Sequence, residues 1–199
     1  MKHSKILNHG FLLLMTCSAL TLSCFGSELP KSPKTLRILN DMDEWRSKKT
    51  SEGKDAAKRL NKMGDKAYKQ KKYYEAHRYY DNSYPNFPNA YAYIMSGDSL
   101  WRSVVQYTVH TTPDKHHCRH SNKDFPDDLE LDISQSYEVG IALAVKDDDK
   151  TLIKSTLYKQ AVESDRCLRK LYDFYKTQAA DACVDLNKIQ HCLGKPLIK

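Results

Sequence analysis

A short pattern recurs after 33 residues in the first half of the chain. Residues Gly64–Lys69 (GDKAYK) and Gly97–Arg102 (GDSLWR) both read glycine, aspartate, any residue, apolar, aromatic, base. A fixed period of roughly 20–50 residues is typical of helical repeat arrays, in which each helix pair buries its apolar face against the next pair. The repeat therefore constrains the fold more strongly than any other feature of this sequence.

Apolar residues recur at helical spacing through most of the chain after residue 33. With only 7 Gly and 7 Pro in 199 residues, a turn-rich β-sandwich or barrel is disfavoured, and no segment has the strict alternation of a strand. The polar stretch 111–128 contains two prolines and no apolar periodicity, which predicts a long loop. We expect an all-α fold with helices at 34–45, 54–70, 73–83, 89–107, 129–146, 151–176 and 181–193.

The segment 57–89 resembles one copy of the tetratricopeptide repeat family. The resemblance rests on a glycine in the first helix, an aromatic that opens the second helix, a small packing residue, a second aromatic and a closing proline: Gly64, Tyr73, Ala76, Tyr80 and Pro88. A partial second copy starts near residue 90 with Gly97, and its second helix is displaced to 129–146, where Gly140 or Ala142 is the small contact. The resemblance implies an antiparallel array of helix hairpins within a single domain over residues 34–199.

In such arrays the first helix of each pair lines a concave groove. The resemblance implies these groove-facing, partner-binding residues: Asn61, Asp65, Tyr68 and Lys69 in the first copy, and Ile94, Asp98, Trp101 and Arg102 in the second. Aromatic and basic side chains are suited to anchoring a peptide. Family members that clamp a terminal carboxylate use Lys and Asn, so the two aspartates argue against that specificity. The alternative is that both aspartates form salt bridges with Lys or Arg along the stack.

The first 26 residues have the order of a secretory signal peptide: a basic head, an apolar run and small residues. A tether with two prolines follows at 27–33. The segment 20–24 resembles a bacterial lipobox ending in Cys24, and lipidation of Cys24 and ordinary cleavage after Gly26 are both open. Either route predicts an exported protein of the periplasm or cell envelope.

Four cysteines remain after export, an even number that predicts two disulfides in an oxidising compartment. If the chain turns near 177–180, Cys167 faces Cys192, and Cys118 ties the long loop to Cys183. The alternative is a continuous helix over 151–193, which would permit at most one bridge, through Cys118.

No constellation in the sequence predicts a metal site, a cofactor or catalysis. The cluster His116–His120 matches the spacing of no closed metal site, and Asp147–Asp149 lacks the alternating ligands of a calcium loop, which favours a helix cap. The usual nucleophile, phosphate-binding and metalloprotease motifs are missing. We therefore expect a protein that is not an enzyme.

The chain is basic, with a formal net charge of +7, and Lys and Arg concentrate in residues 46–72. The simpler interpretation is a solvated helix face, and the alternative is attraction to anionic envelope surfaces. No base-stacking pattern accompanies the charge, so nucleic acid is not an expected partner.

The function that these features favour is binding of a protein or peptide in the groove by an exported, non-catalytic envelope protein. The alternative is an inhibitor or immunity-type protein that blocks an envelope or secreted enzyme with the 111–128 loop.

Overall fold

The computed structural model describes residues 32–111, 116–118, 129–176 and 183–199. The predicted signal peptide, nearly all of the tether and most of the 111–128 loop lie outside this part of the chain. The described residues contain eight helices and two short strands: α1 (Pro33–Ser47), α2 (Ser51–Lys69), α3 (Tyr73–Ser83), α4 (Ala90–Thr111), β1 (His116–Cys118), α5 (Leu129–Lys146), α6 (Lys150–Lys154), α7 (Thr156–Lys176), β2 (Cys183–Asp185) and α8 (Leu186–Leu193). The predicted all-α fold class is confirmed.

The expected helices at 73–83 and 129–146 have the predicted bounds, whereas the expected helices at 151–176 and 181–193 do not. Ser155 adopts an extended backbone and separates α6 from α7, and its hydroxyl accepts from the Tyr158 amide at 3.1 Å. Asp185 caps α8 by accepting from the Asn187 amide at 2.7 Å, so α8 begins at Leu186. Residues 183–185 before it form a short strand. A continuous helix over 151–193 is therefore excluded.

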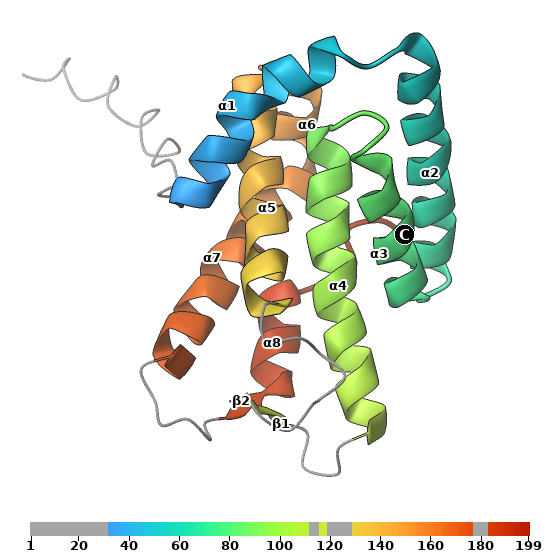
Figure 1. Cartoon of the computed structure of the whole chain (residues 1–199). Helices are drawn as coiled ribbons and strands as arrows, with labels where there is room; N and C mark the ends of the chain where they lie inside the picture. The colour runs from blue at the N-terminus through green and yellow to red at the C-terminus, as the bar shows by residue number, and fades with distance from the viewer. Residues whose placement is uncertain (1–31, 112–115, 119–128, 177–182) are drawn as a thin grey trace, which may run out of the picture. The chain divides into compact units, whose positions relative to one another are not determined.

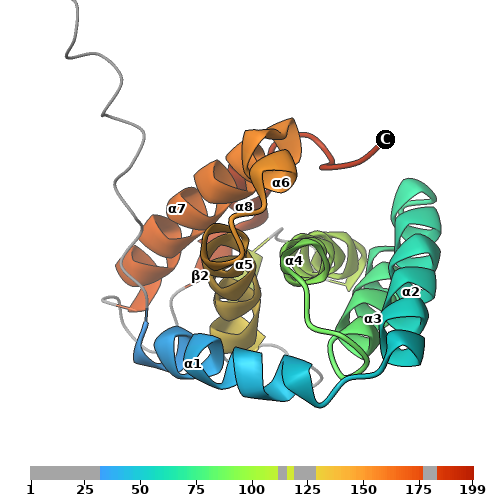
Figure 2. The same ribbon diagram turned by 90° about the horizontal axis from the view of Figure 1, so that it is seen from above.

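The helices pack in chain order, α2 against α3, α3 against α4, and α4 against α5 (Figure 1). Further along the chain, α5 packs on α7, and α7 packs on α8. α8 also packs on α4, so it joins the middle of the array to its end. Seen from above, α1 and the end of the chain lie on opposite sides of α4 (Figure 2).

Close helix crossings at glycine join the pairs. A Cβ at Gly64 would lie 2.6 Å from Cε1 of Tyr80, so the Tyr80 ring of α3 lies directly against α2 at this glycine. A Cβ at Gly140 would lie 2.8 Å from Cγ1 of Ile94, so Gly140 is the small contact between α5 and α4. At these two crossings a larger residue would collide with a buried neighbour.

A disulfide joins Cys167 of α7 to Cys192 of α8, with the Cα atoms 5.3 Å apart. The two helices run in opposite directions (Figure 1), as the prediction of this bridge required. The prediction of a Cys167–Cys192 bridge is confirmed. β1 and β2 are antiparallel, and their register makes Cys118 and Cys183 Cα partners.

Candidate functional site

A buried carboxylate organises the centre of the array. Asp98 of α4 is fully buried, and both of its oxygens accept hydrogen bonds. Oδ1 accepts from the Tyr137 hydroxyl at 2.7 Å, and Oδ2 accepts from the Tyr68 hydroxyl. Arg102, one helical turn further along α4, donates from Nε to Oδ2 at 2.7 Å and from Nη2 to Oδ1 at 3.3 Å. Asp98 thus fixes side chains from α2, α4 and α5.

The electrostatics of this cluster keep the phenols protonated and the guanidinium charged. Burial, followed by the charge of Asp98, raises the pKa of Tyr68 and of Tyr137 well above the ordinary value of a tyrosine. Burial alone would lower the pKa of Arg102, but the charge of Asp98 and the hydrogen bonds to it raise this pKa above its ordinary value. Both phenols therefore act as donors to Asp98, which leaves a lone pair on the Tyr68 oxygen for another donor.

Arg102 and Tyr68 also form hydrogen bonds with the main chain that follows α8. Arg102 Nη2 donates to the Lys195 carbonyl at 2.9 Å, and the Tyr68 hydroxyl accepts from the Leu197 amide at 3.0 Å. From α7, the Gln160 side-chain amide also donates to the Lys195 carbonyl. Residues 195–199 are named the tail segment here, and Tyr68, Arg102 and Gln160 the tail site. The tail site therefore draws one side chain from each of three helices, α2, α4 and α7.

Part of this hydrogen bonding caps a helix. Arg102 Nη2 donates to the Leu193 carbonyl at 3.1 Å, and Gln160 donates to the same carbonyl at 3.0 Å. These contacts satisfy the C-terminal end of α8, where a cation is also favoured by the helix dipole. Gly194, with a φ of 59°, then turns the chain out of the helix. The contacts with Lys195 and Leu197 lie beyond this cap and hold a non-helical segment.

Two adjacent aliphatic side chains complete the contact. Leu197 packs against the apolar cluster that contains Trp101 and against the one that contains Tyr68 and Tyr80. Ile198 packs against the second of these clusters. Both residues are half-buried, whereas Lys195, Pro196 and Lys199 are exposed. The tail segment therefore presents two apolar side chains inward and two lysines to solvent.

The structure corrects the prediction that Ile94 and Trp101 line an open groove. Ile94 is fully buried beneath Gly140, and Trp101 is 1% exposed with its ring 4.9 Å from that of Tyr172. Because α4 is covered by α5, α7 and α8, both residues belong to the core. Tyr68, Asp98 and Arg102 are also buried, so none of the three is open to a partner while the tail segment is in place.

Apart from Tyr68, the predicted residues of the first copy are less buried. Asp65 accepts hydrogen bonds from the hydroxyls of Tyr80 at 2.8 Å and Tyr91 at 2.6 Å. Asn61 donates to the Asn89 side chain at 3.4 Å, and Lys69 is exposed. The salt-bridge alternative is confirmed for Asp98, which pairs with Arg102, whereas Asp65 is held by phenols. Repeat equivalence predicted the same role for both aspartates, and the tail-site residue Gln160 carried no sequence signal.

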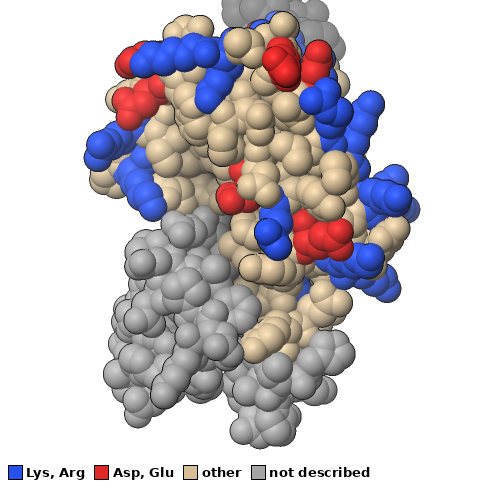
Figure 3. Space-filling model, turned by 45° about the vertical axis from the view of Figure 1, so that its right-hand side comes forward, with Lys and Arg blue, Asp and Glu red and all other residues tan. Residues whose placement is uncertain are grey.

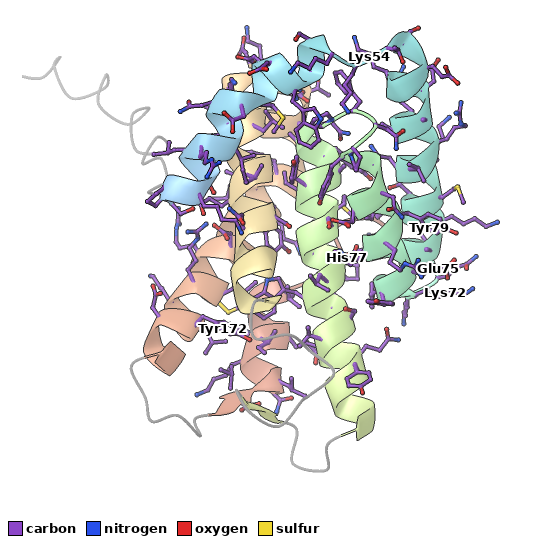
Figure 4. The ribbon with its side chains drawn as sticks, in the orientation of Figure 1. Lys54, Lys72, Glu75, His77, Tyr79 and Tyr172 are labelled. Carbon is purple, nitrogen blue, oxygen red and sulfur yellow. A yellow bond between two sulfur atoms is a disulfide. The ribbon has the colours of Figure 1, made fainter. Side chains whose placement is uncertain are left out.

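A hollow of about 390 Å³ lies between α3, α4 and α5 and is lined in part by His77, Asp81 and Tyr93. His77 Nδ1 lies 2.9 Å from the Ser96 hydroxyl, and Figure 4 shows the ring between α3 and α4. Burial lowers the pKa of His77, although Asp81 opposes this effect. Ser96 is fully buried, so its hydroxyl is closed to a substrate. The His77 contact therefore serves the packing of α3 on α4.

The outer face of α2 carries exposed basic residues at intervals of one helical turn: Lys54, Lys58, Lys62, Lys66 and Lys69. Blue side chains recur along the right-hand edge of Figure 3. Of these lysines, Lys58 lies 3.7 Å from Asp55, an exposed ion pair of little energetic weight. This arrangement agrees with the solvated helix face expected from the sequence.

Within the described residues, no group of His, Cys, Asp and Glu side chains is arranged to hold a metal ion. The side chains of His116–Cys118 lie outside the description. No described helix has the length and apolar character needed to span a membrane. Comparison of the chain with family models, curated proteins and solved structures finds no match.

Proposed function

We propose that this protein is a non-catalytic scaffold that binds a non-helical segment of a protein or peptide partner at the tail site. The observation that carries the proposal is that α2, α4 and α7 together hold main-chain atoms of a non-helical segment. Main-chain hydrogen bonds confer affinity with little dependence on sequence, and pockets for particular side chains add specificity. A helix array of the tetratricopeptide type would present its first helices in this way.

The buried position of Asp98 supports this function. A guanidinium fixed by a bidentate carboxylate loses little further conformational freedom when it binds a carbonyl. The same carboxylate holds the Tyr68 hydroxyl in the direction that leaves its lone pair facing the Leu197 amide. The site is thus preorganised to accept one donor and to donate to one carbonyl of a bound chain.

Site-specific cross-linking tests this function. A photoreactive residue is placed at Gln160 in one preparation and at exposed Lys48, in the turn that follows α1, in a second preparation. Each is irradiated in an envelope extract, and the cross-linked peptides are identified by mass spectrometry. We expect a defined partner peptide to couple from position 160 and not from position 48. Equal coupling from both positions, or none from 160, contradicts the proposal.

The proposed location is the bacterial periplasm or envelope. It rests on the order of basic, apolar and small residues over 1–26. Mass spectrometry of the native protein should find the mature N-terminus at Cys24 or Ser27, with a lipid on Cys24 if the protein is anchored. An intact Met1 would contradict export.

A further inference from the structure

We propose that the tail segment is an intramolecular ligand of the tail site, and that the partner is a non-helical peptide with two adjacent aliphatic residues that displaces it. This inference rests on the proposed function, and it adds the chemistry of the ligand and the event that opens the site. The tail segment defines that chemistry through two main-chain contacts and through the side chains of Leu197 and Ile198.

The contacts divide at Gly194 into a part that is integral to the fold and a part that can detach. Before Gly194, α8 is tied to α7 by the Cys167–Cys192 disulfide, and its end is capped by Arg102 and Gln160. After Gly194, the Leu197 amide bonds to Tyr68, and three of five side chains are exposed. Release of residues 195–199 therefore leaves every described helix and its cap in place.

Release also uncovers a binding site rather than a bare apolar surface. Tyr68 and Arg102 would remain held by Asp98, because those hydrogen bonds do not involve the tail segment. A free peptide then meets the same acceptor, the same donor and the same apolar contacts. While attached, the tail segment competes at an effective concentration on the order of millimolar, which masks the site from a dilute peptide.

Peptide binding by full-length variants tests the proposal. The probe is a fluorescein-labelled, C-terminally amidated peptide with the sequence of residues 195–199, Lys-Pro-Leu-Ile-Lys. Its anisotropy is measured with the wild-type chain, with the double variant Leu197→Asp/Ile198→Asp, and with Lys199→Asp as the matched control. Lys199→Asp changes charge on the same segment at an exposed side chain that the tail-site contacts do not involve.

We expect the double variant to bind the probe at least tenfold more tightly than wild type, and Lys199→Asp to bind like wild type. A probe in which both aliphatic residues are aspartate should not bind the double variant. Equal affinity of all three proteins for the probe, or no binding by a double variant whose circular dichroism matches wild type, overturns the proposal.

Hydrogen exchange of the wild-type chain keeps the proposal testable if the double variant does not fold. The Leu197 amide should exchange faster than the amides of α4, and excess unlabelled probe should accelerate its exchange further by displacing the tail segment. Exchange of Leu197 only at the rate of global unfolding, unchanged by the probe, contradicts the proposal.

The two proposals can fail separately. If the probe does not bind while position 160 still cross-links a partner, the partner does not share the chemistry of the tail segment. The proposed function then stands, and the further inference fails. If the probe binds and no partner couples from position 160, the intramolecular contact stands and the proposed function fails.

Discussion

Tyr80 lies so close to Gly64 that a Cβ at position 64 would be 2.6 Å from Cε1 of its ring. The ring has little room to move, because Tyr80 is fully buried and its hydroxyl donates to Asp65 at 2.8 Å. Gly64 is therefore a packing requirement of the α2–α3 hairpin, and the hairpin presents Tyr68 to the tail site.

Gly64→Ala should lower the free energy of unfolding by about 1 kcal/mol. Alanine is the better helix former by roughly 1 kcal/mol, but overpacking a buried contact costs roughly 1–3 kcal/mol. Met63→Ala is the control, since Met63 is the neighbouring residue and is 46% exposed. Urea denaturation should place this control within about 0.5 kcal/mol of wild type. A Gly64→Ala protein more stable than wild type would show that Tyr80 can shift.

The second prediction concerns the buried ion pair between Asp98 and Arg102. Asp98→Asn leaves a guanidinium that is only 8% exposed without its counter-ion, which should cost roughly 3–5 kcal/mol of stability. Glu44→Gln is the matched control, because Glu44 and Lys48 are also four residues apart, at the end of α1, and lie 2.7 Å from each other at the surface. Loss of this exposed pair should change stability by about 1 kcal/mol at most.

Thermal and urea unfolding of both variants measure this difference. Similar small effects at the two pairs would mean that Arg102 finds another partner in the core. Such a result would also weaken the argument that Asp98 preorganises the tail site.

The helical class and most helix bounds followed from apolar periodicity, whereas the roles of the repeated residues did not. Asp65 and Asp98 occupy the same position in the 33-residue pattern, yet α2 lies at an edge of the array and α4 is covered on several sides. The same residue type is therefore half-buried at one position and fully buried at the other.

The tail site itself could not be predicted from local patterns. It joins Tyr68 to Leu197 over 129 residues and Arg102 to Lys195 over 93 residues. Neither Gln160 nor Leu197 belongs to a repeat or a motif. Their role depends on where tertiary packing places α7 and the end of α8. Tertiary packing also explains why the prediction for Trp101 was wrong. The repeat pattern indicates on which face of its helix Trp101 lies, but not which later helices cover that face.

The third prediction concerns the pH dependence of stability through His77. Burial lowers the pKa of His77 in the folded state, so the unfolded chain binds more protons once the pH falls below the ordinary histidine pKa of about 6.5. The contribution of His77 to stability is complete above that pH and is lost as the pH falls through the lowered pKa of the folded state. Wild type should therefore lose more stability than His77→Gln between pH 7.5 and pH 5.

Urea denaturation of both proteins at the two pH values measures this difference. Asp81 and the Ser96 hydroxyl, which act on the ring, are present in both proteins, so the comparison isolates the imidazole. Identical pH dependence in the two proteins would show that His77 is not protonated on unfolding.

The last prediction concerns the pairing of Cys118, Cys167, Cys183 and Cys192. Cys167 and Cys192 are separated by 25 residues, and a cross-link that closes a loop of this size stabilises a fold by roughly 3 kcal/mol. Cys167→Ser/Cys192→Ser should lose about that amount under oxidising conditions. The difference from wild type should vanish when both proteins are reduced.

Cys118 and Cys183 are expected to form the second bridge, because directly opposed residues of an antiparallel pair have Cα atoms about 4.5–5.5 Å apart, within the span of a disulfide. Peptide mapping without reduction should therefore recover two linked pairs, Cys167 with Cys192 and Cys118 with Cys183. Cys183 lies in β2, whereas Cys192 lies in α8 and is already bonded to Cys167. These two cysteines should therefore not be linked to each other. A peptide linking Cys183 to Cys192, or four free thiols in periplasmic material, would contradict both the pairing and the antiparallel approach of α7 and α8 on which it rests.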